Sequence, residues 1–115
     1  MNESAFNGEP RELDLTRALL LHLTQQERSP PESIFVSLSG LGARWETDPD
    51  DIARALEFLS VRGFIEGPGR FDRDSFLFRK VTVKGRALAR AIGRPRDWKA
   101  IKAHYLTSWR DQELY

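Results

Sequence analysis

Residues 48–67 read D-P-D-D-I-A-R-A-L-E-F-L-S-V-R-G-F-I-E-G, and this stretch decides the fold. Asp48 can cap a helix, Pro49 suits the first helical position, and Gly63 can take the left-handed conformation that ends a helix. Phe64 and Ile65 then begin an apolar strand. The apolar residues recur at the i, i+3, i+4, i+7 spacing of one helical face: Ile52, Ala55, Leu56 and Leu59. The stretch therefore predicts a capped amphipathic helix that leads directly into a strand.

The composition predicts one soluble domain. At 115 residues the chain has room for one modest core, and its 40% hydrophobic and 30% charged residues are ordinary for a folded globular protein. No apolar run approaches the roughly 18 residues of a membrane span, and the first ten residues lack the basic start and apolar centre of a signal peptide. We therefore expect a cytoplasmic protein with no membrane partner. The absence of cysteine excludes disulfides and thiolate metal sites.

Charge divides the chain into an acidic and a basic half. The formal net charge is only +1, but residues 1–67 sum to −6 and residues 68–115 sum to +7. Such an asymmetry suggests a charged partner. The basic half could meet a polyanion, two copies could meet acidic half to basic half, or the halves could neutralise each other within one chain.

The N-terminal third predicts a leader and two helices. Residues 1–10 mix small and polar side chains and are expected to be a flexible leader. Residues 13–26 predict the first helix, in which His22 is expected to be structural; its apolar face contains Leu15, Leu19, Leu20 and Leu23. Ser29-Pro30-Pro31-Glu32 matches the capping box, so a second helix is predicted from there through Ile34, Phe35 and Leu38 to Gly40 or Gly42.

The connection to residue 48 is then longer than the tight turn of a helix-turn-helix, so the two helices are expected to be set apart. Trp45 in this connection either covers the core edge or is an exposed anchor.

After Ile65 the sequence predicts a hairpin. Residues 64–66 and 76–81 favour strands, and residues 67–69 and 71–75 carry turn residues between them. Asp72 and Asp74 form a D-x-D pattern, which supplies too few ligands for calcium or magnesium. A solvated hairpin tip is the preferred interpretation.

Two further helices are predicted at the C-terminal end. One follows Thr82 as its cap and ends at Gly93 and Pro95, with an apolar face of Ala87, Leu88 and Ala91. A last helix is predicted over residues 96–110, and it carries an aromatic stripe of Trp98, Ile101, Tyr105 and Trp109. This stripe either packs on its own core or forms a contact between chains.

Two short motifs resemble the winged helix-turn-helix superfamily, and in particular small MarR- and PadR-type bacterial or phage-encoded regulators. Residues 59–65 match L-x-x-x-G-[LFY]-[IV], which closes the recognition helix in such families, and residues 81–85 match [LIV]-T-x-x-G, which opens the helix after the wing. The resemblance covers about residues 13–92. It implies a mainly helical α+β fold with about five helices and a two-stranded wing. The implied divisions are a leader (1–10), a winged-helix domain (11–94) and an appended C-terminal helix (95–115).

The resemblance also implies a homodimeric transcription regulator that binds double-stranded DNA, with no cofactor. The third helix would enter the major groove while the wing contacts the backbone or the minor groove. Carried over by position, the DNA-binding residues would be Arg54 on the third helix, Arg70, Arg73, Arg79 and Lys80 on the wing, and Lys84, Arg86 and Arg90 on the fourth helix. The dimer interface would be the stripe of Trp98, Ile101, Tyr105 and Trp109.

The acidic start of the third helix departs from that pattern. Asp48, Asp50 and Asp51 stabilise the helix through its dipole, by about 0.3–1 kcal/mol each, but they repel phosphate. The expected DNA contacts therefore shift to the wing. The alternative function is a protein–protein interaction module on a winged-helix scaffold. The residues suggest no enzyme, because the two histidines lie far apart in sequence and no phosphate-binding glycine motif is present.

Overall fold

The computed structural model describes residues 10–103. Its elements, in chain order, are α1 (Pro10–Gln26), β1 (Ile34–Ser37), α2 (Leu38–Trp45), α3 (Pro49–Val61), β2 (Ile65–Glu66), β3 (Gly69–Arg70), β4 (Ser75–Phe78), β5 (Lys80–Val81) and α4 (Val83–Ile92). Residues 95–103 form a further helical segment. Of the predicted leader, residues 1–9 lie outside the described residues, as do residues 104–110 of the predicted last helix. The domain boundaries at residues 10 and 94 stay a prediction.

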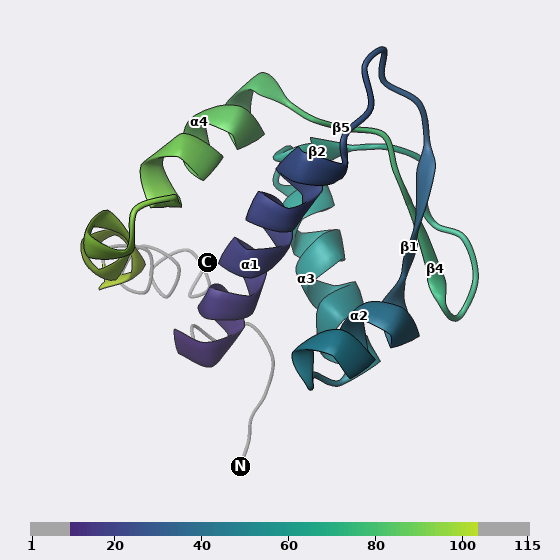
Figure 1. The fold of residues 1–115 in the computed structure, drawn as a ribbon, viewed down its shortest axis with the longest axis horizontal. Coiled ribbons are helices and arrows are strands. Elements are labelled where there is room, and N and C mark those ends of the chain that lie inside the picture. Colours follow the sequence, from purple (N-terminus) through teal and green to yellow (C-terminus); the bar gives the residue numbers. More distant parts are fainter. Residues whose placement is uncertain (1–9, 104–115) are drawn as a thin grey trace, which may run out of the picture.

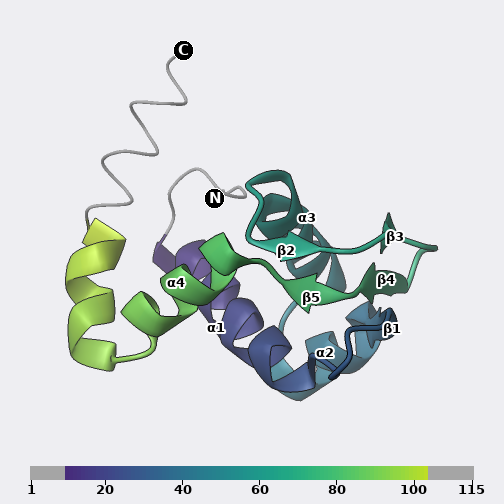
Figure 2. The same ribbon diagram turned by 90° about the horizontal axis from the view of Figure 1, so that it is seen from above.

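The helices surround one core, and the strands extend from it on one side. α1 lies beside α3 and also packs on α4, while α2 packs on α3 (Figure 1). β1 and β4 lie on the opposite side of the molecule from α4 in both Figure 1 and Figure 2. The largest fully buried side chains are Phe78, Leu19, Leu20, Leu23, Leu38, Ile52, Leu56, Leu59 and Val81.

The strands form a hairpin that is joined by a third strand. β2 pairs antiparallel with β5, and β3 pairs antiparallel with β4, so residues 65–81 are one hairpin in two parts. β1 pairs antiparallel with the other edge of β4. A helix, a strand, two helices, a hairpin and a further helix follow one another in the order of a winged helix. The predicted fold class, mainly helical α+β with a wing, is confirmed.

The second helix was predicted at the wrong place. Residues 34–37 are strand β1, and α2 begins only at Leu38. Val36 is buried opposite Phe76, whereas its neighbours Phe35 and Ser37 are exposed, so the segment has the two-residue period of a strand. The capping-box pattern at residues 29–32 was misleading, because Ser37 is the residue that caps α2. Its hydroxyl accepts a hydrogen bond from Gly40 N at 3.0 Å.

The connection between α2 and α3 is tight, and the predicted loose spacing is wrong. Only Glu46, Thr47 and Asp48 separate the two helices, and Glu46 takes the left-handed conformation with φ 53°. Gly42 lies inside α2 rather than at its end. A Cβ atom on Gly42 would lie 2.6 Å from the carbonyl oxygen of Thr47, so glycine is what lets the turn fold back this closely.

The predictions for α3 and for the start of α4 are confirmed. Asp48 caps α3, Gly63 follows it with φ 80°, and Thr82 caps α4. The predicted apolar face of α4 needs correction, since Ala87 and Ala91 are exposed. The buried residues of α4 are Gly85, Ala89 and Ile92, with Leu88 half-buried beside them. Within residues 10–103, no helix is long and apolar enough to cross a membrane.

Candidate nucleic-acid interface

Asp74 of the wing fastens the hairpin to the start of α2. Its carboxylate accepts hydrogen bonds from Ser39 N at 2.8 Å and from the Ser37 hydroxyl at 3.0 Å. Its backbone carbonyl accepts from Leu38 N at 2.7 Å. The hydrogen bonds from Ser39, with a smaller contribution from Ser37, lower the pKa of Asp74. Asp74 stays accessible to solvent, as predicted for the tip, but its bonds to α2 were not predicted.

This contact fills the position at which a helix N-terminus would bind an external anion. Free N–H groups and the helix dipole make such an end suitable for phosphate. In α2 the wing's own carboxylate already occupies it. A phosphate could bind there only by displacing Asp74.

The tip of the wing is held in shape by its own side chains. The Arg70 guanidinium donates to the carbonyl oxygen of Asp72 at 2.7 Å and to that of Arg73 at 3.0 Å. The Asp72 carboxylate accepts from Asp74 N at 2.9 Å. The Arg73 side chain is exposed and makes no hydrogen bond or ion pair with any residue between 10 and 103. Arg73 is thus the guanidinium that the tip leaves available to a partner.

An aromatic pair on the wing was missed from the sequence. Phe35 of β1 and Phe71 of the wing tip meet edge to face, with ring centroids 5.4 Å apart. They remain 64% and 60% exposed, which is unusual for phenylalanine in a folded domain. The two-residue alternation around Phe35 was a signal for this exposure, but a helix had been predicted there.

The base of the wing carries cations that share one acid. Arg79 lies 3.6 Å from the Glu66 carboxylate, and Lys80 lies 4.0 Å from it. All three side chains are about half exposed, so water screens these pairs and each contributes little to stability.

Two of the three predicted cations of α4 contact other helices of the same chain. Lys84 donates to the carbonyl oxygen of Arg62 at the end of α3, at 2.7 Å. Arg86 pairs with Glu27, just beyond the end of α1, at 2.5 Å. Arg90 is exposed in the last turn of α4.

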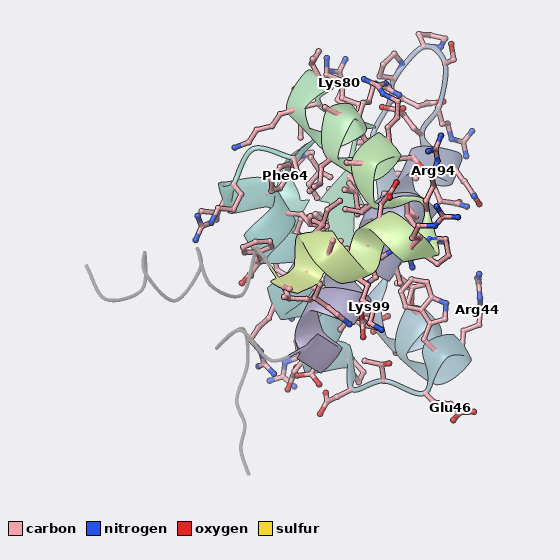
Figure 3. All side chains as sticks on the ribbon, turned by 90° about the vertical axis from the view of Figure 1, so that its left-hand side faces the viewer. Arg44, Glu46, Phe64, Lys80, Arg94 and Lys99 are labelled. Carbon is pink, nitrogen blue, oxygen red and sulfur yellow. The ribbon has the colours of Figure 1, made fainter. Side chains whose placement is uncertain are left out.

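Lys80, at the base of the wing, is distant from the turn between α2 and α3. Figure 3 shows Lys80 at one end of the molecule and Glu46 of that turn at the other. Apart from Arg54 on α3, the predicted DNA-binding residues belong to the wing and to α4.

The exposed face of α3 is acidic. Arg54, the predicted base contact, forms an ion pair with Asp51 one turn earlier in the helix. Asp50 and Glu57 are exposed beside it, while Ala53 is buried, with 4% of its surface exposed. The start of α3 thus presents carboxylates, and its one arginine is already paired.

The described part of the aromatic stripe contacts its own chain. Trp98 and Ile101 are half-buried against the core. The Trp98 indole donates to the Asp14 carboxylate at 2.8 Å, and Lys102 pairs with the same carboxylate at 3.0 Å. The segment after α4 is thereby fixed to α1. Tyr105 and Trp109 lie outside the described residues.

His22 contacts an aromatic side chain at the edge of the core. Its ring meets the Trp45 ring edge to face, with centroids 5.5 Å apart, and Trp45 covers the edge of the core. Burial, and then the charge of Arg44, lower the pKa of His22. No group of three or more potential metal ligands lies among residues 10–103.

The sequence matches no protein-family model, and no curated protein is detectably similar to it. Two solved structures of Lactococcus lactis ZitR share a partial likeness of fold. A double mutant in the apo form aligns over 90% of this chain and 67% of its own, with a TM-score of 0.47 and 17% identity. A second mutant aligns over 88% of this chain and 58% of its own, with a TM-score of 0.47 and 16% identity. At these values the likeness supports no assignment of function.

Proposed function

We propose that this chain is a DNA-binding winged-helix protein that regulates transcription and holds duplex DNA mainly through its wing. One observation carries the proposal. Asp74 of the wing tip is hydrogen-bonded to the start of α2, and a three-residue turn joins the end of α2 to α3, so the hairpin is fastened to a closely joined helix pair. Helix pairs with such short turns and adjacent hairpins are a common arrangement for contacting a groove and its backbone.

The contacts divide according to what each cation already binds. Arg73 can meet a phosphate without breaking any contact, whereas Arg70 keeps the tip rigid through its bonds to the backbone. Arg79 and Lys80 can exchange the half-exposed Glu66 for phosphate at little cost. Arg54 would have to leave Asp51, so we rank it last among the proposed contacts.

Phosphate contacts of this kind give affinity and salt dependence but no sequence preference. The proposal therefore predicts binding to duplexes of unrelated sequence. The segment after residue 95 is proposed to join two copies, which would place two wings on one duplex.

The test is a fluorescence-anisotropy titration of a labelled duplex of about 25 base pairs at several salt concentrations. The logarithm of the affinity should fall linearly with the logarithm of the salt concentration. Arg73→Gln should weaken binding to all sequences equally and reduce the magnitude of this slope by about one, as expected for a lost phosphate contact.

Arg94→Gln is the matched control, because the Arg94 side chain is 85% exposed and follows α4 in the chain, outside the wing hairpin. It should leave both the affinity and the slope unchanged. No duplex binding at low salt would refute the proposed function. Binding that Arg73→Gln leaves intact would refute the role of the wing.

A protein-interaction module is the second candidate, and the exposed Phe35–Phe71 pair favours it. Aromatic side chains that stay exposed, as these do on β1 and on the wing tip, commonly mark a contact with another protein. The acidic face of α3 fits this function as well, since it does not have to approach phosphate. The titration separates the candidates, because only the first requires salt-dependent duplex binding.

A further inference from the structure

A groove separate from the proposed DNA contacts lies between α1, β1 and α2. It has a volume of about 250 Å³ and is lined by His22, Gln26, Ile34, Phe35, Val36, Ser37, Gly40, Leu41 and Arg44. Since one water molecule takes up about 30 Å³, this space suits a molecule of roughly eight non-hydrogen atoms. The groove is thus large enough for a small organic molecule.

The walls of the groove are mostly apolar. Val36 and Leu41 belong to the core, and Ile34 packs against that core from β1. Gln26, from the last turn of α1, adds an exposed amide at the rim. An apolar body of a few carbon atoms would therefore find both contact area and a polar edge.

The groove carries a positive charge, and no acidic side chain in its lining neutralises that charge. Arg44 is the one residue with a permanent charge among those that line it, and none of them is acidic. The Arg44 guanidinium is exposed and has no ion pair with any residue from 10 to 103 (Figure 3). Its charge reaches His22 on the facing helix, because it contributes to the lowered pKa of that imidazole. An anion placed between these two side chains would be attracted by Arg44 and would accept a hydrogen bond from the neutral imidazole N–H.

We propose that this groove binds a small organic anion whose acidic group meets Arg44 and whose apolar body lies against Ile34, Val36 and Leu41. A guanidinium binds carboxylate or phosphate through two parallel hydrogen bonds, which makes it the strongest anchor available here. Gln26 and His22 supply further donors on the α1 side. This site does not depend on DNA binding.

Hexanoate is the probe, because it has eight non-hydrogen atoms and one carboxylate, and hexanamide is its neutral match. The chain has two histidines, so a His104→Gln background leaves His22 as the one imidazole that NMR observes. Hexanoate should shift the His22 ring signals to saturation. It should also raise the pKa of His22, because the anion offsets the charge of Arg44, and no other charged residue lines the groove. Butyl phosphate in place of hexanoate distinguishes a phosphate from a carboxylate as the preferred acidic group.

Arg44→Gln should weaken hexanoate binding by about tenfold or more. It should also raise the pKa of His22 in the absence of any anion. Arg28→Gln is the control, since Arg28 is exposed, pairs with Glu32 at 3.7 Å and does not line the groove. It should change neither result.

Equal responses to hexanoate and hexanamide would overturn the proposal, as would saturable hexanoate binding that Arg44→Gln leaves intact. Arg44 is exposed, so its substitution leaves the core untouched, which a thermal melt verifies. If Arg44→Gln fails to fold, the comparison of hexanoate with hexanamide on the chain that retains Arg44 still tests the proposal.

Discussion

α2 and α3 both begin at a capping side chain, but their caps connect different parts of the molecule. α3 is capped by Asp48, whose carboxylate accepts from Asp50 N at 2.8 Å, two residues further on. α2 is capped by Ser37 and also by Asp74, which comes from the wing 35 residues beyond Ser39. The first cap stabilises one helix, whereas the second also holds a hairpin in place.

The start of α4 resembles that of α2, because its capping residue also contacts another element of the fold. The Thr82 hydroxyl accepts from Gly85 N at 3.0 Å and donates to the carbonyl oxygen of Gly63 at 2.6 Å, so this cap ties α4 to the end of α3. Of the starts of α2, α3 and α4, those of α2 and α4 therefore also connect two elements of the fold; we call such a contact a joint. The contrast also bears on DNA binding, because the starts of α2 and α3 both carry carboxylates where phosphate would otherwise bind.

The largest expected effect on the free energy of unfolding comes from substituting a glycine at one of these two joints, with the glycine at the other joint as its comparison. Gly40 and Gly85 occupy the same position in α2 and α4, and each donates its N–H to the cap at 3.0 Å. A Cβ atom on Gly85 would lie 2.0 Å from the carbonyl oxygen of Phe64, whereas one on Gly40 would meet only the Ser37 side chain at 3.0 Å. Gly85→Ala should lower the free energy of unfolding by about 3 kcal/mol, because backbone must move to admit the methyl group.

Gly40→Ala is the matched control for this prediction. It gains helix propensity, at most about 1 kcal/mol, and loses part of that gain to the tight contact with Ser37. Urea unfolding monitored by circular dichroism measures both variants. Similar losses from Gly40→Ala and Gly85→Ala would mean that the close approach of α4 to Phe64 is not what requires glycine.

Local caps are also the ones that sequence predicts. Asp48, Pro49 and Gly63 lie within or next to the helix they bound, so their residue types and spacing sufficed. Thr82 was predicted as a cap for the same reason, but its bond to Gly63 was not. Of the DNA-binding candidates, Arg73 was placed on the wing, where its side chain is exposed, but the sequence could not tell which cations were already paired.

The errors fall where a distant partner decides the structure. Residues 34–37 have no helix-breaking residue of their own, and they form a strand because β4 supplies an edge for pairing. Asp74 looked like half of a D-x-D pattern because its partners, Ser37 and Ser39, lie far away in sequence. The groove with Arg44 was not predicted either, since it exists only once α1, β1 and α2 are brought together in the fold.

The second prediction compares the local cap Asp48 with the joint residue Asp74 by the rates of amide hydrogen exchange in their alanine variants. Asp48→Ala should lower the free energy of unfolding by about 1 kcal/mol and speed exchange at the first turn of α3 alone. Asp74→Ala should speed exchange at Leu38 and Ser39 in α2, and also at Phe71 in the wing, because both elements lose a shared contact. Mass-spectrometric exchange with peptide resolution measures both.

Ser37 keeps its bond to Gly40 in the Asp74→Ala variant, so α2 itself should persist. Arg73→Ala serves as the control, since this neighbouring substitution removes a side chain with no bond to α2. The role of Asp74 as a joint would be contradicted if the amides of the wing exchanged no faster in Asp74→Ala than in the unmodified chain.

The smallest expected effect is a pH dependence of the same joint. Hydrogen bonds from Ser39 hold the pKa of Asp74 below its ordinary value of 3.8, so folding favours the ionised carboxylate. Its contribution to stability is therefore complete above pH 3.8 and is lost as the pH falls through the lower pKa of the folded state. Asp74→Asn should lower the melting temperature by a constant amount from about pH 7 to pH 5, and this difference should shrink in more acidic solution, where Asp74 becomes protonated. Other carboxylates titrate in both chains and cancel in the comparison. A difference in melting temperature that stays constant down to the pH of acid unfolding would contradict this prediction. It would mean that the negative charge of Asp74 does not strengthen its hydrogen bonds to α2, and that Asp74→Asn destabilises the protein only because the amide fits less well.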